Sequence, residues 1–160
     1  GSEMCIRDRE KADEDRIPKK VMRMFMCQYL LSKTYKDMFD ENKILSAYSD
    51  ETERFEAHHI IPLGTVKKVG ESTKKLRDDE KNICNSPLNF VYITKKANKE
   101  ISDESLKDYV QKINAEAKAK LHITAYTNSD IPQDQVKQIL RERYDFLKGD
   151  IRERISTLLS

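Results

Sequence analysis

Apolar side chains recur at helical spacing over most of this chain. Residues 18–31 predict a helix, since a proline suits a first helical position and the apolar residues fall near one face. That face consists of Val21, Met24, Phe25, Gln28 and Leu31. We expect its methionines and aromatic residues to be core. A second, short helix is predicted over 44–48.

Two short apolar stretches predict strands instead. Residues 55–62 are interrupted mainly by polar histidines and end at a proline. Residues 88–94 are rich in β-branched and aromatic side chains, and their final threonine can cap a short helix over 95–100. A long loop over 63–83, with a helical turn near 73–81, connects the strands. Together these segments predict a ββα unit.

The last third of the chain is predicted to be helical. Ser102 or Asp103 caps a helix that runs to about Leu121. Its stripe is Leu106, Tyr109, Val110, Ile113, Ala117 and Leu121. After a break at 128–132, a last helix begins near Gln133 and is expected to pack on the first helix, with a partner contact as the alternative. Its stripe is Val136, Leu140, Tyr144, Leu147, Ile151, Ile155 and Leu158.

These elements predict an α+β fold that is mostly helical, in which a small ββα unit is flanked by N-terminal and C-terminal helices. We expect one domain over 1–160, with a helical part over 1–54, the ββα core over 55–101 and a helical part over 102–160. The opening residues resemble an expression scar, so we expect the chain to be a fragment of a longer protein.

Composition narrows the class of protein. The chain is 36% charged and 38% hydrophobic, which is typical of a soluble protein, and no apolar run reaches the roughly 20 residues of a membrane helix. Three cysteines without a C-x-x-C pair argue against a structural zinc site. We therefore expect a cytoplasmic protein with reduced thiols and no membrane partner.

The positive charge is concentrated around the ββα unit. Residues 62–99 hold nine Lys or Arg residues against four Asp or Glu residues. Such an excess would attract a polyanion, although a solvated lysine-rich loop explains the charge alone equally well. The candidate phosphate contacts are Lys67, Lys68, Lys95, Lys96 and Lys99.

Candidate chemistry centres on the adjacent pair His58 and His59. Neighbouring side chains of a strand point to opposite faces, but at a strand end one imidazole can bind a metal while the other handles a proton. Asn89 and Asn98 lie in the same ββα unit. Taken alone, each of these residues can be explained without a catalytic role. The histidine pair can be incidental polar residues, Asn89 can bond the backbone of a turn, and Asn98 can lie on the surface of a helix. The third histidine, His122, is expected only to pack or face solvent.

The motifs of this unit resemble those of the HNH nucleases, members of the ββα-metal (His-Me finger) superfamily. The resemblance rests on Ala57-His58-His59-Ile60-Ile61-Pro62, Leu88-Asn89-Phe90-Val91-Tyr92-Ile93-Thr94 and Lys95-Lys96-Ala97-Asn98-Lys99. It covers about residues 55–110 closely. That region and the helical tail over 141–159 are similar to the C-terminal nuclease domain of GmrSD-type restriction and phage-defence proteins.

The resemblance implies a role for each matching residue. His58 matches the first metal ligand, and His59 matches the general base that activates water. Asn89 matches the residue that hydrogen-bonds the turn and holds the base in orientation, and Asn98 matches the last metal ligand. Because Asn98 stands where many members have histidine, Mg²⁺ is favoured, with Mn²⁺ and Zn²⁺ as alternatives. Glu56, beside the pair, is given little weight as a contact of metal or water.

These expectations converge on a metal-dependent endonuclease that hydrolyses DNA phosphodiester bonds by a one-metal HNH mechanism in bacterial restriction or phage defence. RNA is the alternative substrate, and a non-catalytic module that binds nucleic acid or docks on a partner is the alternative class. A homo-oligomer and further domains of a longer chain both stay open. Cys84 and Asn85 are expected to pack a turn rather than to take part in the chemistry.

Overall fold

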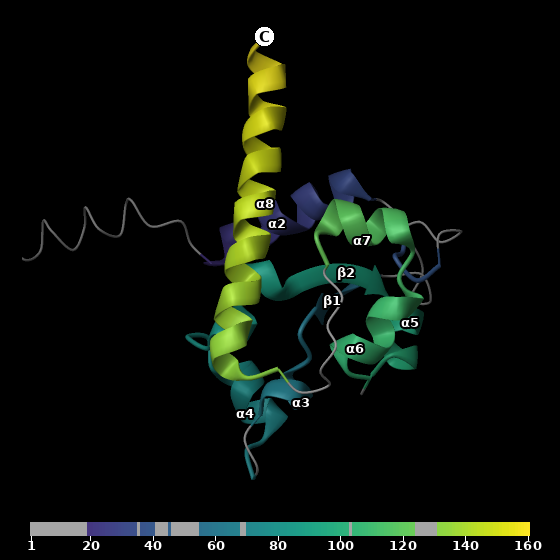
Figure 1. The fold of residues 1–160 in the computed structure, drawn as a ribbon, viewed down its shortest axis with the longest axis vertical. Coiled ribbons are helices and arrows are strands. Elements are labelled where there is room, and N and C mark those ends of the chain that lie inside the picture. Colours follow the sequence, from purple (N-terminus) through teal and green to yellow (C-terminus); the bar gives the residue numbers. More distant parts are fainter. Residues whose placement is uncertain are drawn as a thin grey trace, which may run out of the picture.

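The computed structural model describes residues 19–34, 36–40, 45, 55–67, 70–102, 104–123 and 131–160. Its elements in chain order are α2 (Lys19–Lys33), β1 (Phe55–His59), α3 (Leu63–Val66), α4 (Thr73–Asp78), the 3₁₀ turns η1 (Ile83–Asn85) and η2 (Pro87–Asn89), β2 (Phe90–Thr94), α5 (Lys95–Glu100), α6 (Leu106–Tyr109), the 3₁₀ turn η3 (Val110–Lys112), α7 (Ala115–Leu121) and α8 (Gln133–Leu159). The described part is mostly helical with one two-stranded sheet (Figure 1), which confirms the α+β class. None of the described helices combines the length and apolar content that a membrane crossing requires.

The two strands form an antiparallel pair in the middle of the molecule (Figure 1). His58 is opposite Val91 and His59 is opposite Phe90 in the register. Helix α5 follows β2 directly, and the Thr94 side chain accepts a 3.2 Å hydrogen bond from the Ala97 N–H, as expected of a cap. The order of the elements is therefore strand, loop, strand and helix, as predicted.

Both strands are shorter than predicted. β1 ends at His59 rather than Pro62, because the Ile61 N–H donates to the side chain of Asn89 instead of to a strand. β2 begins at Phe90 rather than Leu88, because η2 bends the chain after the capping residue Ser86. The intervening loop contains two helices, and α4 lies where the helical turn near 73–81 was predicted.

The single helix predicted over 102–121 is wrong, since this region forms α6, η3 and α7. Ser105 and Asn114 cap α6 and α7 with their side chains, so two internal caps compete with a continuous helix. All six residues of the predicted stripe are nevertheless buried. The apolar pattern identified the core side chains correctly but not the breaks between turns.

Helix α2 is present, but its predicted buried face is wrong. Val21, Met24 and Phe25 are 49% to 60% exposed, whereas Met26 and Leu30 are buried in the core. Apolar side chains surround this helix, so spacing alone did not select the face that packs against β2. The helix predicted over 44–48 lies outside the described residues apart from Leu45, which is buried.

Helix α8 is continuous through Gly149, and its predicted stripe divides into two parts. Val136, Leu140 and Leu147 are buried, whereas Ile155 and Leu158 are exposed on the part that extends beyond the other described elements (Figure 1). The first part packs against η1 and η2. Polar contacts join α8 to α2, through Asp150 to Tyr29 and Lys33 and through Arg154 to Ser32.

Asp150 makes the first of these polar contacts. Its carboxylate accepts a hydrogen bond from the Tyr29 hydroxyl and pairs with Lys33 at 3.1 Å. Burial opposes ionisation of Asp150, but the hydrogen bonds from Tyr29 and Lys33 outweigh it and hold its pKa below the ordinary 3.8. The ionised carboxylate therefore stabilises the fold.

We expect Asp150→Asn to lower the free energy of unfolding by about 1 kcal/mol at neutral pH. A carboxyl whose pKa is lower in the folded state stabilises the protein above its unfolded pKa, and this stabilisation is lost as the pH falls through its folded pKa. The difference between variant and wild type should therefore be smaller in urea unfolding at an acidic pH below the ordinary 3.8 than at pH 7. Asp145→Asn, an exposed site on the same helix, is the control. An equal difference at both pH values would contradict the role of the charge.

Candidate active site

The end of β1 presents the two histidines to different partners. The Nδ1 atom of His58 lies 3.2 Å from Oδ1 of Asn98, on α5. The amide nitrogen of Asn98 donates to Glu56 Oε2 at 2.8 Å. Since Glu56 and His58 are two residues apart on one strand, they share a face and hold Asn98 between them. This contact turns the Asn98 oxygen toward the imidazole.

His58 sits in an environment that keeps its ring neutral. Burial lowers the pKa of His58 to about 4. The ring packs edge-on against Tyr109, with centroids 5.4 Å apart. Its Nε2 atom is buried and has no hydrogen-bond partner in the described part of the chain. A neutral imidazole is the form that binds metals, so His58 is chemically suited to be a ligand.

His59 faces the other way and meets an asparagine that was not expected to take part. Its Nε2 lies 3.1 Å from Oδ1 of Asn85 in η1. The centroid of its ring lies 4.4 Å from the centroid of the Phe90 ring. Burial lowers the pKa of His59, and the charges of Arg77 and Arg23 lower it further. Asn85, expected only to pack a turn, is thus the side chain that contacts the candidate base.

Asn89 lies at the centre of the loop connections and is fully buried. Its Oδ1 accepts from the Ile61 N–H at 2.9 Å, and its Nδ2 donates to the carbonyl oxygens of Cys84 at 2.8 Å and Ile61 at 3.2 Å. These bonds match the turn-holding part of its expected role. The side chain that contacts the His59 ring by a hydrogen bond is that of Asn85 and not that of Asn89.

A cleft of about 1150 Å³ contains His58, His59, Asn85 and Asn98 in its lining. Its other lining residues are Arg23, Ala57, Pro62, Leu63, Gly64, Thr65, Lys67, Thr73, Arg77, Phe90, Ser102, Glu104, Ser105 and Asp108. Three cations therefore lie on the same cleft as the imidazoles. Its volume exceeds the usual range of small-molecule pockets, so the cleft has room for a segment of an extended polymer.

The predicted phosphate contacts are only partly in this cleft. Lys67 lines it, whereas Lys95, Lys96 and Lys99 on α5 are not among its lining residues. Lys96 is exposed and pairs with Glu100 of its own helix at 3.9 Å. Lys68 lies outside the described residues.

Two arginines of this lining were not among the predicted phosphate contacts. Arg77, from α4, was counted in the basic stretch over 62–99 but was not singled out from it. Arg23 comes from α2, far from the histidine pair in sequence, and no pattern in the sequence marks it as a partner of β1.

The types of possible ligand atoms and the distance between them show whether a divalent ion fits here. Among the described residues, no group of three His, Cys, Asp or Glu side chains forms a metal site. His58 Nδ1 and Asn98 Oδ1 are 3.2 Å apart, and two neighbouring ligands of one ion at about 2.1 Å are separated by roughly 3 Å. The pair therefore fits two adjacent positions on an ion, with the other positions left to water or substrate.

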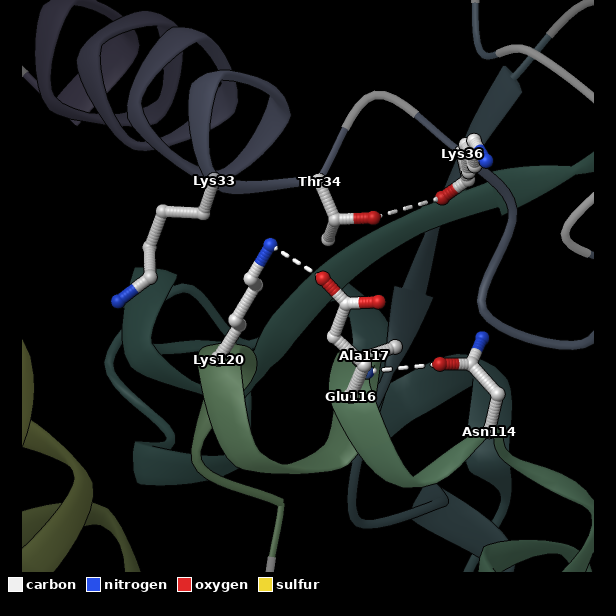
Figure 2. A pocket seen from close by; sticks show the side chains of 7 residues that line it. All are labelled: Lys33, Thr34, Lys36, Asn114, Glu116, Ala117 and Lys120. Atoms are coloured by element: carbon white, nitrogen blue, oxygen red, sulfur yellow. Dashed lines mark hydrogen bonds and ion pairs between the residues drawn. The ribbon is translucent and has the colours of Figure 1, made fainter.

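A smaller pocket of about 200 Å³ lies between the end of α2 and α7 (Figure 2). Figure 2 shows Lys120 paired with Glu116, at 2.6 Å, and the Asn114 side chain capping α7. Lys33 pairs with Asp150 elsewhere. Two of the three lysines of this pocket are therefore already paired, and the pocket contains no histidine.

The paired histidines, Asn85, Asn98 and three cations line one cleft of this α+β fold. Histidine is the most frequent general base of enzymes, and cations bind the phosphates of nucleic acids. The family of GmrSD restriction endonucleases, C-terminal domain, matches residues 6–148. The chain therefore belongs to this family and is a nuclease domain of the restriction type, as its motifs had indicated. No curated protein and no solved structure gives a significant match.

Removing the two expected asparagines should have different consequences. Asn89→Ala leaves buried backbone groups of Ile61 and Cys84 without partners, and we expect the free energy of unfolding to fall by about 3 kcal/mol. Asn98→Ala removes contacts at the edge of the cleft and should cost less than about 1 kcal/mol. Thermal and urea unfolding of both variants measure this difference. Equal destabilisation would show that Asn89 is not the main structural link.

Proposed function

We propose that this domain is a metal-dependent endonuclease that hydrolyses phosphodiester bonds of DNA by an HNH-type mechanism with one metal ion. The contact between His58 and Asn98, made beside His59 in a cleft lined by cations, is the observation that carries the proposal. The family to which the chain belongs supports a role in bacterial restriction and phage defence.

His59 acts as the general base in this proposal. Its pKa is lowered by burial and by the two arginines, so the ring is neutral at physiological pH and can accept a proton. In the reaction, His59 takes a proton from a water molecule, and the water oxygen attacks phosphorus as the bond to the leaving oxygen breaks. Arg23, Lys67 and Arg77 bind phosphate oxygens and hold the strand in the cleft.

His58 and Asn98 hold the divalent ion. When bound, the ion supplies Lewis-acid stabilisation of the charge that develops on the phosphate and the leaving oxygen. Glu56 orients Asn98 so that its oxygen, rather than its nitrogen, faces the site. One amide oxygen and one imidazole favour Mg²⁺ or Mn²⁺, and Zn²⁺ is the less favoured alternative.

Cleavage of plasmid DNA is expected with Mg²⁺ or Mn²⁺ and is expected to stop in EDTA. His59→Ala should lower the rate about 10²- to 10⁴-fold, as loss of a general base does. His122→Asn is the matched control because His122 lies outside the cleft lining and has φ of 51°, a conformation that asparagine tolerates. Equal activity of wild type and His59→Ala would exclude His59 as the base.

Metal binding by these variants distinguishes the role of the base from that of the metal ligands. Calorimetric titration with Mn²⁺ should show weaker binding for His58→Ala and Asn98→Ala and nearly unchanged binding for His59→Ala. A parallel digest of DNA and RNA decides the substrate. DNA binding without turnover in any metal would favour the non-catalytic module.

The cleft arginines, rather than the lysines of α5, should carry DNA affinity. We expect Arg23→Ala and Arg77→Ala each to weaken duplex binding in EDTA and to reduce the slope of log affinity against log salt by about 1. Lys96→Ala is the control, since this exposed lysine lies outside the cleft lining. Fluorescence anisotropy at several salt concentrations measures both quantities. A larger loss of DNA affinity in Lys96→Ala than in the two arginine variants would show that α5 makes the phosphate contacts.

A further inference from the structure

The amide of Asn85 is locked in one orientation. Its Nδ2 donates to the carbonyl oxygens of Leu76 at 2.7 Å and Asp79 at 2.8 Å, and lies 3.3 Å from that of Arg77. The residue is only 7% exposed. A reversed amide would place its oxygen against these carbonyl oxygens and lose every one of these bonds. Oδ1 of Asn85 must therefore face His59.

This orientation decides which nitrogen of His59 carries the proton. An amide oxygen can only accept a hydrogen bond, so the His59 Nε2 atom, 3.1 Å away, must be the donor. In a neutral imidazole the other nitrogen then has the free lone pair. His59 lines the cleft, and its Nδ1 is left as the atom able to accept a proton.

We infer that Asn85 is a positioning residue that fixes the Nε2–H tautomer and the ring orientation of His59. This inference rests on the proposed function of His59 as the base. Its support is structural as well as chemical, because the carbonyls that hold Asn85 belong to the end of α4 and the turn that follows it. The same helix carries Arg77 into the cleft. One short helix thus supplies a phosphate contact and the anchor for the base.

Asn82 provides a matched control for this role. Its side chain accepts from the Cys84 N–H at 2.9 Å and caps η1, three residues before Asn85. It makes the same kind of local backbone contact but is not a partner of His59. Asn82→Ala therefore reproduces the cost of disturbing this turn without touching the candidate base.

Long-range ¹H–¹⁵N NMR of the histidine ring in the wild-type protein tests the tautomer directly and needs no variant. We expect the proton on Nε2 of His59 in wild type and in Asn82→Ala, and a mixture of tautomers in Asn85→Ala. A proton on Nδ1 in the wild type, or no change in Asn85→Ala, would overturn the inference.

Kinetics test the consequence for catalysis. Asn85→Ala should lower kcat for plasmid cleavage at least about tenfold with KM changed less than about twofold, whereas Asn82→Ala should keep kcat near the wild-type value. Equal losses in both variants would reduce Asn85 to a structural residue. A wild-type protein that cleaves nothing would overturn the proposed function and, with it, the effect of Asn85 on cleavage. The NMR measurement separately decides whether Asn85 fixes the tautomer of His59.

Discussion

The buried carboxamide of Asn89 is the contact on which the candidate site depends. It joins the backbone of Ile61, just after the histidine pair, to the Cys84 carbonyl in η1, while the Ile60 N–H donates to the Asn89 carbonyl. A two-stranded sheet is marginally stable alone, so its end needs such anchors. Because all of these groups are buried, losing the amide leaves several of them unpaired at once. Asn89 therefore fixes the turn that directly follows the two histidines.

The alternation of a strand gives the two histidines different surroundings. His58 and His59 point to opposite faces, and each meets an amide oxygen, from Asn98 on α5 and Asn85 in η1. Hydrogen bonds from the amide nitrogens fix the orientation of both asparagines. The Asn98 nitrogen donates to Glu56, and the Asn85 nitrogen donates to backbone carbonyl oxygens. Burial favours the neutral ring in both cases. Two adjacent residues of one kind therefore acquire different partners without any difference in their own chemistry.

Sequence patterns predicted what depends on neighbours along the chain. The strand–loop–strand–helix order, the Thr94 cap and the buried stripe ending at Leu121 follow from local spacing. The meeting of His58 with Asn98, 40 residues apart in sequence, was expected from the resemblance to the HNH nucleases and not from spacing. Features set by tertiary packing were not predictable. The buried face of α2 and the entry of Arg23 into the cleft depend on how that helix docks on β2, and Asn85 depends on where α4 ends. Apolar residues around all of α2 gave no preference for one face.

The buried part of the C-terminal helix α8 supports the candidate site. Arg143 is almost fully buried, and its guanidinium donates to the carbonyl oxygens of Leu121 and Leu88, the residue before Asn89. Burial lowers the pKa of Arg143 to about 10, so the charge persists at neutral pH and its cost must be offset by these bonds. The family match ends at residue 148, close to the last buried apolar residue, Leu147. Beyond that point Ile151 is half-buried against the core, and Ile155 and Leu158 are exposed. The family match therefore covers the part of α8 that packs on the rest of the domain and holds the Asn89 turn in place.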